Sequence, residues 1–226
     1  KRYKELLKSS IKDKKIELKE IIDFVKKNST TKFDESIDVS LRINLKQSKG
    51  GDLSLRTVVK LPNGSGKKSK VAVLCEPDKI EEAKKSGAEI VGSEDLIEKI
   101  STGKFDFTKL ICTPAMMSKI GKYGKVLGPK GLMPNPKLGT VTNDLSSAIK
   151  NIKSGQVEYK TDKAGLIHAP VGKISFSDDE LKKNIVFFLD ELKKKKPENS
   201  KGVFIKKFFI TSTMGPGLQV DSTSVM

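Results

Sequence analysis

Hydrophobic and polar residues alternate strictly along residues 37–45, and this stretch is the clearest pattern in the chain. Alternation with a period of two is typical of a strand that buries one face. Residues 55–61 favour the returning strand of a hairpin, reached through a turn at 49–52. Ahead of both, residues 16–27 carry hydrophobic side chains at helical spacing with lysines opposite, which predicts an amphipathic helix.

The pattern changes after residue 66. Residues 71–75 form a short, continuous hydrophobic run, which is typical of a strand buried on both faces. Further short hydrophobic runs follow, separated by segments with helical spacing, and this alternation predicts a small parallel α/β sheet. The expected strands are 71–75, 89–91 and 110–112; the expected helical segments are 78–85, one from Ser93, a turn from Pro114 and one from Asn143 to Gly155.

The hairpin pattern returns from residue 156. Ser177 and Glu180 have the spacing of a capping box, which predicts a helix that runs to about residue 195 and is stopped by Pro197. We expect strands at 157–160, 166–168, 173–176 and 203–210, followed by a polar, glycine-rich loop at 211–217.

These patterns predict a discontinuous domain. We expect an α+β domain made of residues 1–66 and 156–226, with an α/β domain at residues 67–155 inserted into it. Glycines lie at both chain crossings, at Gly64–Gly66 and at Gly155, and would let the two domains hinge. A single compact domain with an α/β middle is the alternative that the pattern leaves open.

The charge balance changes the picture, because the 226-residue chain has a formal net charge of +16. Hydrophobic residues make up 36% and charged residues 32%, so the chain is globular and a polyanion is its expected partner. Both predicted domains are basic and neither has a concentrated basic arm. A polyanion surface must therefore be built by folding, which suits a shaped RNA. The alternative is a lysine-rich proteome that places lysine on every surface.

The sequence gives little support for a disulfide, a metal site, a membrane span or a secretion signal. Cys75 and Cys112 lie in apolar surroundings without a CxxC pair or a nearby histidine, which is typical of core residues in a reducing compartment. No hydrophobic run approaches the roughly 18 residues of a membrane span, and nothing at the start resembles a secretion signal. We therefore expect a cytoplasmic protein with no membrane contact, no metal and no cofactor.

Catalytic motifs are also missing. His168 is the only histidine, and the HExxH, GxSxG and Walker A sequences do not occur. The glycine- and lysine-rich stretch at 121–131 lacks the GKS/T ending of a phosphate cradle, and Pro129 removes a backbone donor there. We expect no enzyme, with His168 a strand residue that has a satisfied hydrogen bond. A nucleotide-dependent enzyme using this stretch is the competing hypothesis.

The same stretch continues as a long loop to residue 139, where proline and glycine oppose helix or regular sheet over much of its length. A long loop in a compact domain is usually functional, and its lysines would meet phosphates on an exposed tip. The alternative is a structural wrap that packs Leu132 and Met133 on the core.

A second candidate for RNA contact is the loop Thr211–Gly217, next to Lys206 and Lys207. Hydroxyls can bond ribose and phosphate, the methionine can lie on a base or sugar, and glycine permits close backbone approach. Lys32 and Phe33 precede the first long strand and would share this surface. The alternatives are an ordinary polar turn for the loop and a core position for Phe33.

These residues carry a family resemblance. The stretch GKYGKVLGPKGLMPNPKLGTVT at 121–142 closely resembles the signature of the large-subunit ribosomal protein L-one family, in its bacterial or organellar branch. The segments GSEDLIEKI, SGQVEYKTDKAGLIHAPVGKISF, KGVFIKK and TSTMGPG also resemble that family, in the same order and over essentially the whole chain.

The resemblance implies a split α+β domain with an inserted Rossmann-like α/β domain on a two-stranded hinge. It implies that the split domain binds the 23S ribosomal RNA of the mobile stalk, as a monomer within the ribosome. Its signature loop comprises Gly124, Lys125, Gly128, Pro129, Lys130, Gly131, Met133 and Pro134. The implied RNA contacts are Lys32, Phe33, Thr211, Thr213, Met214 and Gly215, with Lys163, His168, Lys173 and Lys206 as weaker candidates.

The resemblance further implies that the protein helps to move and release deacylated tRNA at the exit (E) site. Bacterial members also repress their own messenger RNA by binding a leader that mimics the ribosomal site, so a free translational regulator is a second hypothesis. One residue departs from the family pattern: Lys130 stands where many relatives have arginine, which removes the planar fork for a bidentate phosphate contact.

Overall fold

The computed structural model describes residues 2–9, 16–44, 55–67, 69–103, 105–196 and 203–221. The chain divides into two compact units: residues 1–66 with 157–226, and residues 67–156. The turn predicted at 49–52 and the helix stop at Pro197 lie outside the described residues. Within the described ranges, no helix has the length and apolar character needed to cross a membrane.

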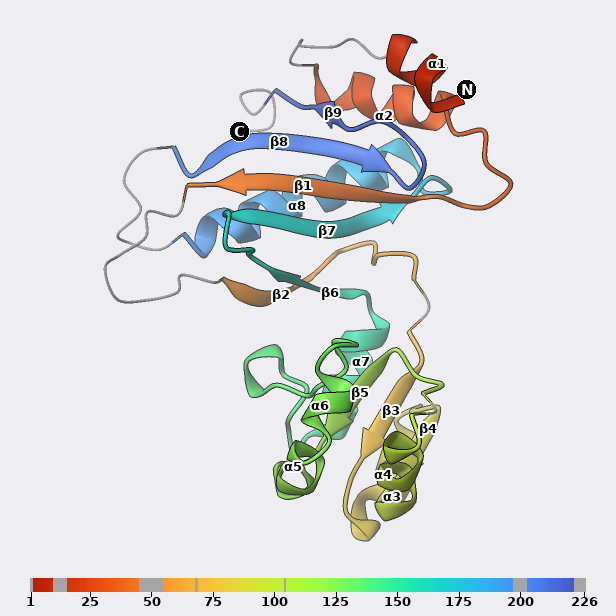
Figure 1. The fold of residues 1–226 in the computed structure, drawn as a ribbon, viewed down its shortest axis with the longest axis vertical. Coiled ribbons are helices and arrows are strands. Elements are labelled where there is room, and N and C mark those ends of the chain that lie inside the picture. Colours follow the sequence, from red (N-terminus) through yellow and green to blue (C-terminus); the bar gives the residue numbers. More distant parts are fainter. Residues whose placement is uncertain are drawn as a thin grey trace. The chain divides into compact units, whose positions relative to one another are not determined.

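A four-stranded antiparallel sheet forms the centre of the first unit (Figure 1). Its strand order is β7-β1-β8-β9, so the early strand β1 pairs on both sides with strands from the far end of the chain. The strands are β1 (Ser36–Ile43), β7 (Leu166–Lys173), β8 (Ile205–Ser212) and β9 (Leu218–Gln219), and a separate two-stranded sheet contains β2 (Arg56–Lys60) and β6 (Gln156–Lys160). The helices are α1 (Arg2–Ser9), α2 (Leu18–Lys27) and α8 (Asp178–Lys194).

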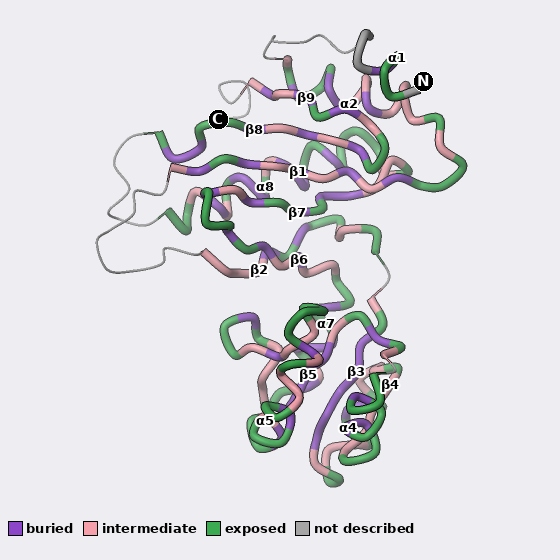
Figure 2. The backbone as a smooth tube through the Cα atoms, viewed as in Figure 1, coloured by how far each residue is buried: buried purple, intermediate pink, exposed green. Residues whose placement is uncertain are grey.

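One face of this sheet is buried against α2 and α8, and Figure 1 shows α8 behind β1 and β7. The alternating pattern of β1 causes this, because every second side chain enters a shared hydrophobic cluster, and Figure 2 shows the same alternation in colour. The strand predicted at 37–45 is therefore confirmed as far as Ile43, and the helix predicted at 16–27 is confirmed from Leu18 onward. The cluster includes Ile37, Val39, Leu41 and Ile43 of β1, Ile21 and Ile22 of α2, and Ile185 and Phe188 of α8.

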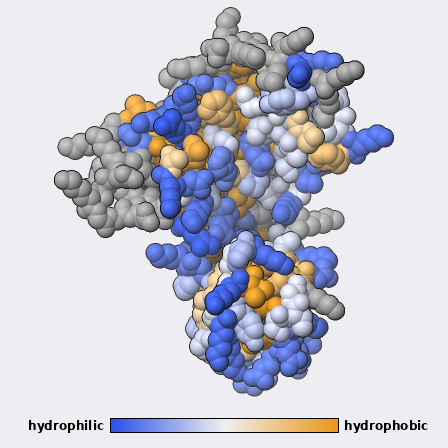
Figure 3. Space-filling model, viewed as in Figure 1, coloured by the Kyte–Doolittle hydropathy of each residue, from blue (hydrophilic) through white to orange (hydrophobic). Residues whose placement is uncertain are grey.

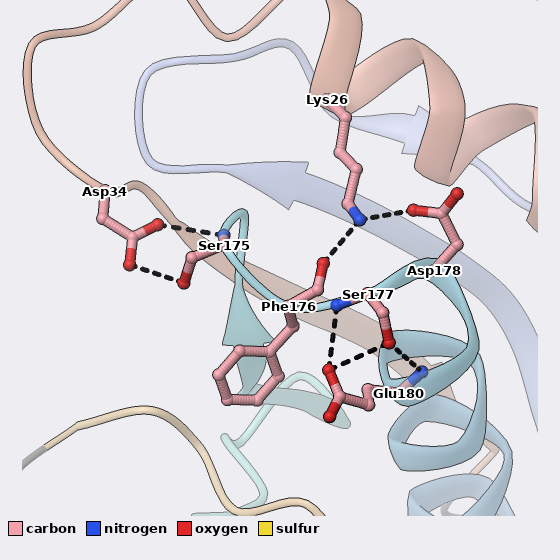
Figure 4. A network of polar contacts seen from close by, with 7 residues as sticks. All are labelled: Lys26, Asp34, Ser175, Phe176, Ser177, Asp178 and Glu180. Carbon is pink, nitrogen blue, oxygen red and sulfur yellow. Dashed lines mark hydrogen bonds and ion pairs between the residues drawn. The ribbon is translucent and has the colours of Figure 1, made fainter.

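The predicted capping box begins α8 and is drawn in Figure 4. The Ser177 hydroxyl accepts a hydrogen bond from the Glu180 amide at 3.3 Å, and the Glu180 carboxylate accepts one from the Ser177 amide at 2.9 Å. Each side chain thus satisfies a donor that the first helical turn would leave unpaired. Lys26 of α2 joins this helix start by donating to the Phe176 carbonyl and to Asp178.

The second unit contains the predicted parallel α/β sheet. Its three strands have the order β4-β3-β5, and the side chains of the central strand β3 alternate between two hydrophobic clusters. The sheet is therefore covered on both faces, as its continuous hydrophobic runs predict. The strands are β3 (Val71–Leu74), β4 (Ile90–Gly92) and β5 (Lys109–Cys112). The helices are η1 (Pro77–Lys79), α3 (Ile80–Lys85), α4 (Glu94–Ser101), α5 (Pro114–Gly121), α6 (Gly124–Leu127), η2 (Pro136–Leu138) and α7 (Leu145–Lys153).

Two strand predictions are wrong. The hairpin between 37–45 and 55–61 does not form, because β1 pairs with β7 and β8 while β2 pairs with β6. The strand expected at 166–168 is longer, because β7 runs from Leu166 through Pro170 to Lys173, and no strand forms at 174–176, where the chain turns. Proline is tolerated there because β7 is an edge strand, so no neighbour needs the missing amide.

Two further differences concern the candidate loops. The short helix α6 forms where glycine and proline were expected to oppose one, because the residues between Tyr123 and Gly128 contain no proline and Leu127 is buried. Thr211 and Ser212 belong to strand β8 rather than to the loop after it, since both pair with β1.

Candidate nucleic-acid interface

The segments around Phe33 and Met214 come together where β1 begins and β8 ends. Ile37 of β1 is paired with Ser212 of β8. Just beyond this pair, the Ser36 amide donates to the Thr213 hydroxyl at 3.0 Å, and the Thr213 amide donates to the Ser36 carbonyl at 3.1 Å. Two stretches far apart in the sequence thus form one local structure, which we call the β1–β8 surface: residues 29–36 and 211–215.

Glu35 is the centre of this surface, and the sequence reasoning missed it. Its side chain is buried, with only 1% of the residue exposed. One carboxylate oxygen accepts hydrogen bonds from the hydroxyls of Thr31 at 2.8 Å and Ser29 at 3.3 Å. The other accepts from the backbone amide of Met214 at 3.1 Å. A single carboxylate therefore fixes both segments.

The protonation of Glu35 follows from these donors. Burial by itself raises the pKa of the carboxyl, but hydrogen bonds from Ser212, Thr31, the Met214 amide and Ser29 outweigh burial and lower the pKa below its ordinary value. Glu35 is therefore ionised at neutral pH. Hydrogen bonds to an ionised acceptor are about twice as strong as those between neutral groups, so Glu35 links the two segments strongly.

The turn after β8 is tightly packed at Gly215. The Gly215 amide donates to the Ser212 carbonyl at 3.2 Å, and the Thr211 hydroxyl donates to the carbonyls of Ser212 at 3.0 Å and Gly215 at 3.3 Å. A Cβ atom at Gly215 would overlap the Ser212 hydroxyl, so any side chain there must displace it. The hydroxyl of Thr211 is thus used inside the turn.

Phe33 and Met214 are exposed at this surface, 54% and 52% of each residue respectively. The alternative that Phe33 belongs to the core is therefore wrong. Their backbones are nevertheless held, because the Phe33 carbonyl accepts from the Thr31 hydroxyl at 2.9 Å and the Met214 amide donates to Glu35. Lys32 and Thr213 are exposed beside them. These two apolar side chains on held backbones are therefore candidates for contact with a partner.

Lys173 lies close to these residues. Its ammonium group is 3.5 Å from the Asp34 carboxylate, which also accepts from the amide and hydroxyl of Ser175 (Figure 4). Burial opposes ionisation of Asp34, but these bonds and the charge of Lys173 lower its pKa. Lys173 therefore both supports the loop before β1 and adds positive charge beside it.

The remaining candidate residues lie elsewhere on the first unit. His168 is exposed in the middle of β7, and its Nδ1 is 3.0 Å from the Ser40 hydroxyl, which fits a strand residue with a satisfied hydrogen bond. Lys163 lies in the turn between β6 and β7, and Lys206 lies near the start of β8, at the opposite end of the sheet from Thr213. These side chains do not join the β1–β8 surface.

The signature loop belongs to the second unit, where it packs on the core as a structural wrap, while contact of its lysines with phosphates stays a prediction. Leu127 and Pro134 are buried, and Leu132 and Met133 pack partly buried against the hydrophobic cluster. On the face of this unit that is turned to the viewer, Figure 3 shows apolar side chains surrounded by hydrophilic ones. The loop is therefore a structural wrap that presents charge at its surface. The exposed residues among the candidates are Lys125, Gly128, Pro129, Lys130 and Gly131.

Two details explain residues of that loop. The Gly128 amide donates to the Gly124 carbonyl at 2.8 Å, and a Cβ atom at Gly128 would lie 2.7 Å from that oxygen. This close approach requires glycine at position 128. The Lys130 ammonium lies 3.9 Å above the ring centre of Phe105, a cation–π contact that partly engages the charge.

The described residues contain no group of three histidine, cysteine or acidic side chains placed to hold a metal ion. Cys75 and Cys112 are both buried and free. Burial raises the pKa of the Cys112 thiol to about 11, so it is protonated at neutral pH and unsuited to be a nucleophile or a metal ligand.

Comparisons with known proteins identify the relatives of this chain. The family model described as "Ribosomal protein L1p/L10e family" matches residues 25–216. A protein of Pelagibacter ubique is 56% identical over 204 residues, covering 90% of this chain and 89% of that protein. Proteins of Coxiella burnetii and Thermosipho africanus are 47% and 48% identical, each covering 100% of this chain and 97% of the relative. All three are named large ribosomal subunit protein uL1.

Proposed function

Because the chain belongs to the ribosomal protein L1p/L10e family, we propose that it is a structural component of the large ribosomal subunit and binds 23S ribosomal RNA through the β1–β8 surface. Its contacts are Lys32, Phe33, Thr211, Thr213, Met214 and Gly215, with Lys173 adjacent. The protein acts by binding and carries out no reaction. The relatives named large ribosomal subunit protein uL1 support the ribosomal part of this proposal.

The observation that carries the RNA-binding part is the geometry around Glu35. A buried carboxylate fixes two segments so that Phe33 and Met214 stay exposed on a rigid backbone. Preorganised groups bind more tightly because less conformational freedom is lost on binding. An exposed aromatic, a thioether and a close-packed backbone suit the irregular shape of folded RNA, where bases are unstacked and ribose hydroxyls are accessible.

Charge supplies the second part of the mechanism. The chain has a net charge of +16; Lys32 belongs to the β1–β8 surface, and Lys173 lies beside it. Lysine contacts with phosphate release counterions, so affinity should fall steeply as salt rises. Shape recognition by the rigid surface then supplies selectivity, and the lysines supply a salt-dependent contribution that is common to all RNA.

Two finer roles belong to this proposal. We propose that the protein assists release of deacylated tRNA at the exit site, and that the same surface binds the leader of its own messenger RNA. Competition distinguishes shared from separate sites: ribosomal RNA fragment and leader should displace one another. Simultaneous binding of both RNAs would contradict a shared surface.

We further propose that residues 1–66 and 156–226 form the RNA-binding domain, and that the chain crossings to the inserted domain at 67–155 act as a hinge. Glycines with left-handed backbone angles lie near both crossings: φ is 71° at Gly66 and 89° at Gly155. Dyes attached to Lys60 and Lys119 of the full chain would report the motion by single-molecule energy transfer. One narrow, unchanging distance would contradict a hinge.

Ribosome fractionation tests the main proposal. The tagged full-length chain should sediment with large subunits at low salt and detach at high salt. Recovery only in ribosome-free fractions would contradict it. The competing enzyme hypothesis is tested by equilibrium dialysis with labelled ATP and GTP, in which saturable micromolar binding that disappears on Lys125→Ala would revive that hypothesis.

A further inference from the structure

The sheet face that points away from α2 and α8 has an unusual composition. Side chains of β1, β7, β8 and β9 meet there in three cross-strand rows, and no helix among the described residues packs on it. Figure 3 shows apolar side chains between hydrophilic ones on the face that is turned to the viewer. The rows are Lys207, Arg42 and Leu166; then Gln219, Phe209, Ser40 and His168; then Thr211, Asp38 and Pro170.

The first row places two cations directly opposite each other. Arg42 is paired with Lys207 across β1 and β8, and both side chains are exposed. Like charges in directly opposed positions destabilise a sheet. Within the described parts of the chain, neither side chain forms an ion pair with a carboxylate. An anion bound between the two cations would remove their repulsion, so this pair favours an external anion.

The middle row places an aromatic ring beside hydrogen-bonding groups. Phe209 is only partly buried, although it occupies an interior strand of the sheet. Ser40 is its direct neighbour on β1, and the Ser40 hydroxyl is 3.0 Å from Nδ1 of His168 on the next strand. Gln219 is its neighbour on β9. The accessible part of this ring can stack on a base, and the flanking groups can bond the edge of that base.

The third row gives the face a direction. Asp38 is partly buried there, and burial raises the pKa of its carboxyl while the nearby His168 opposes that shift. An acidic group disfavours phosphate at this end, so phosphate is expected at the Arg42 end. Thr211 shares the row with Asp38, so the face is continuous with the β1–β8 surface.

We propose that this sheet face is a second RNA subsite that takes one unpaired nucleotide, with its base on Phe209 and its phosphate between Arg42 and Lys207. Adjacent rows are about 7 Å apart, a separation that one nucleotide spans from base to phosphate. The proposal rests on the proposed function, because the nucleotide is part of RNA held at the β1–β8 surface. Two cations beside the ring favour RNA over a protein partner.

The test uses the full chain and two probes: a transcript of the ribosomal RNA stalk, and a labelled single-stranded RNA decamer of mixed sequence. Phe209→Ser should weaken decamer binding by roughly 5- to 150-fold, the range expected when one base–aromatic stack is removed. Arg42→Ser with Lys207→Ser should also weaken it and reduce the slope of log affinity against log salt by about 0.7 for each phosphate that is no longer bound. Duplex RNA binding should be unaffected by Phe209→Ser.

Matched controls lie on α8, in the layer behind the sheet. Phe187→Ser removes an exposed phenylalanine, and Lys182→Ser with Lys183→Ser removes two exposed lysines. Equal decamer affinities for Phe209→Ser and Phe187→Ser would overturn the subsite. The same result is expected if the face binds a protein partner and not RNA. Melting temperatures of all variants identify any failure to fold.

The two probes keep the subsite and the proposed function distinct. Thr213→Ala with Met214→Ala should weaken binding of the stalk transcript by roughly 150-fold and retain binding of the decamer. If the unaltered chain fails to bind the transcript while Phe209→Ser still weakens decamer binding, the proposed function fails and only the base-stacking part of the subsite survives. If the transcript binds and Phe209→Ser changes neither RNA, the subsite alone is wrong.

Discussion

The carboxylate of Glu35 accepts a hydrogen bond from the backbone amide of Met214 at 3.1 Å, although 179 residues separate them. The same carboxylate holds the segment that contains Phe33 through Thr31. The two exposed apolar residues of the proposed RNA surface therefore depend on one buried acid. A variant without this carboxylate tests whether the surface depends on it.

Glu35→Gln should lower the free energy of unfolding by about 1–3 kcal/mol, because the amide replaces an ionised acceptor of several hydrogen bonds. RNA affinity should fall as well, since Met214 loses its backbone anchor. Chemical denaturation and RNA titration measure the two effects. Glu20→Gln, at an exposed position on α2, is the matched control and should change neither. An unchanged Glu35→Gln variant would show that the carboxylate is not the anchor.

The pKa of Glu35 gives a dependence of stability on pH. Its pKa in the folded state lies below its ordinary value of 4.5, so the unfolded chain binds a proton at higher pH than the folded one. The carboxylate therefore contributes full stability above pH 4.5 and loses that contribution as pH falls through the folded pKa. The free energy of unfolding, measured from about pH 6 down to about pH 3, should fall more steeply for the unaltered chain than for Glu35→Gln. Parallel curves would contradict this.

In the Glu35→Gln variant, Asp34 should still make the free energy of unfolding fall with pH, though less steeply. Hydrogen bonds from Ser175 and the charge of Lys173 lower its pKa, so it too loses a stabilising contribution in acid. Adding Asp34→Asn to Glu35→Gln should flatten the curve further, because both depressed carboxyls are then absent. Asp95→Asn, at an exposed position, serves as the control.

Gly215→Ala should weaken RNA binding at least tenfold, because its methyl group displaces the Ser212 hydroxyl that donates to Glu35. The cost to stability should be about 1 kcal/mol, which is typical of local overpacking. Adding Ser212→Ala removes the overlapping hydroxyl, so the double variant should recover part of the affinity. If the double variant binds no better than Gly215→Ala, steric overlap is not the cause.

Thr213→Ala with Met214→Ala should weaken binding to the stalk RNA by about 3 kcal/mol, since buried RNA groups lose their partners. Thr213→Ser alone keeps the hydroxyl that accepts from the Ser36 amide and should bind nearly normally. Filter binding at fixed salt measures the difference. A change within error for the double variant would remove this loop as the main contact.

Asn184→Leu should lower the free energy of unfolding by about 2–4 kcal/mol without changing RNA affinity per folded molecule. Asn184 is fully buried in α8, accepts from the Asn63 amide at 3.1 Å, and donates to the carbonyls of Gly64 at 2.9 Å and Val171 at 2.8 Å. Hydrogen exchange at Asn63 should accelerate first. Unaltered exchange there would show that this network does not limit local opening.

Local patterns predicted the strand β1 and the start of helix α8, because alternation and capping depend on residues close in sequence. They did not predict the partners of β1. Alternation reveals which side chains are buried but does not say which strand lies alongside, so the nearer segment at 55–61 was a wrong choice. Pro170 misled in a similar way, since only the sheet order shows that its strand is at an edge.

The candidate site likewise contains residues that the sequence indicates and residues that only long-range contacts reveal. The hydroxyl-bearing residues, the glycines and the methionine at 211–217 are visible in the sequence, as are Lys32 and Phe33. Glu35 was missed because the residues around it form no recognisable motif. Its role depends on a hydrogen bond from the amide of Met214, 179 residues away. The outward row of Phe209, Ser40 and His168 likewise requires the strand register.

The position of β1 at the middle of its sheet has a consequence for biosynthesis. Its neighbours β7 and β8 begin at Leu166 and Ile205, so a nascent chain carries β1 without any strand partner while the intervening segment is translated. The contiguous unit at 67–156 can fold during that interval. The first unit can complete its central sheet only after β8 has been synthesised, and β1 has no strand partner on that side until then.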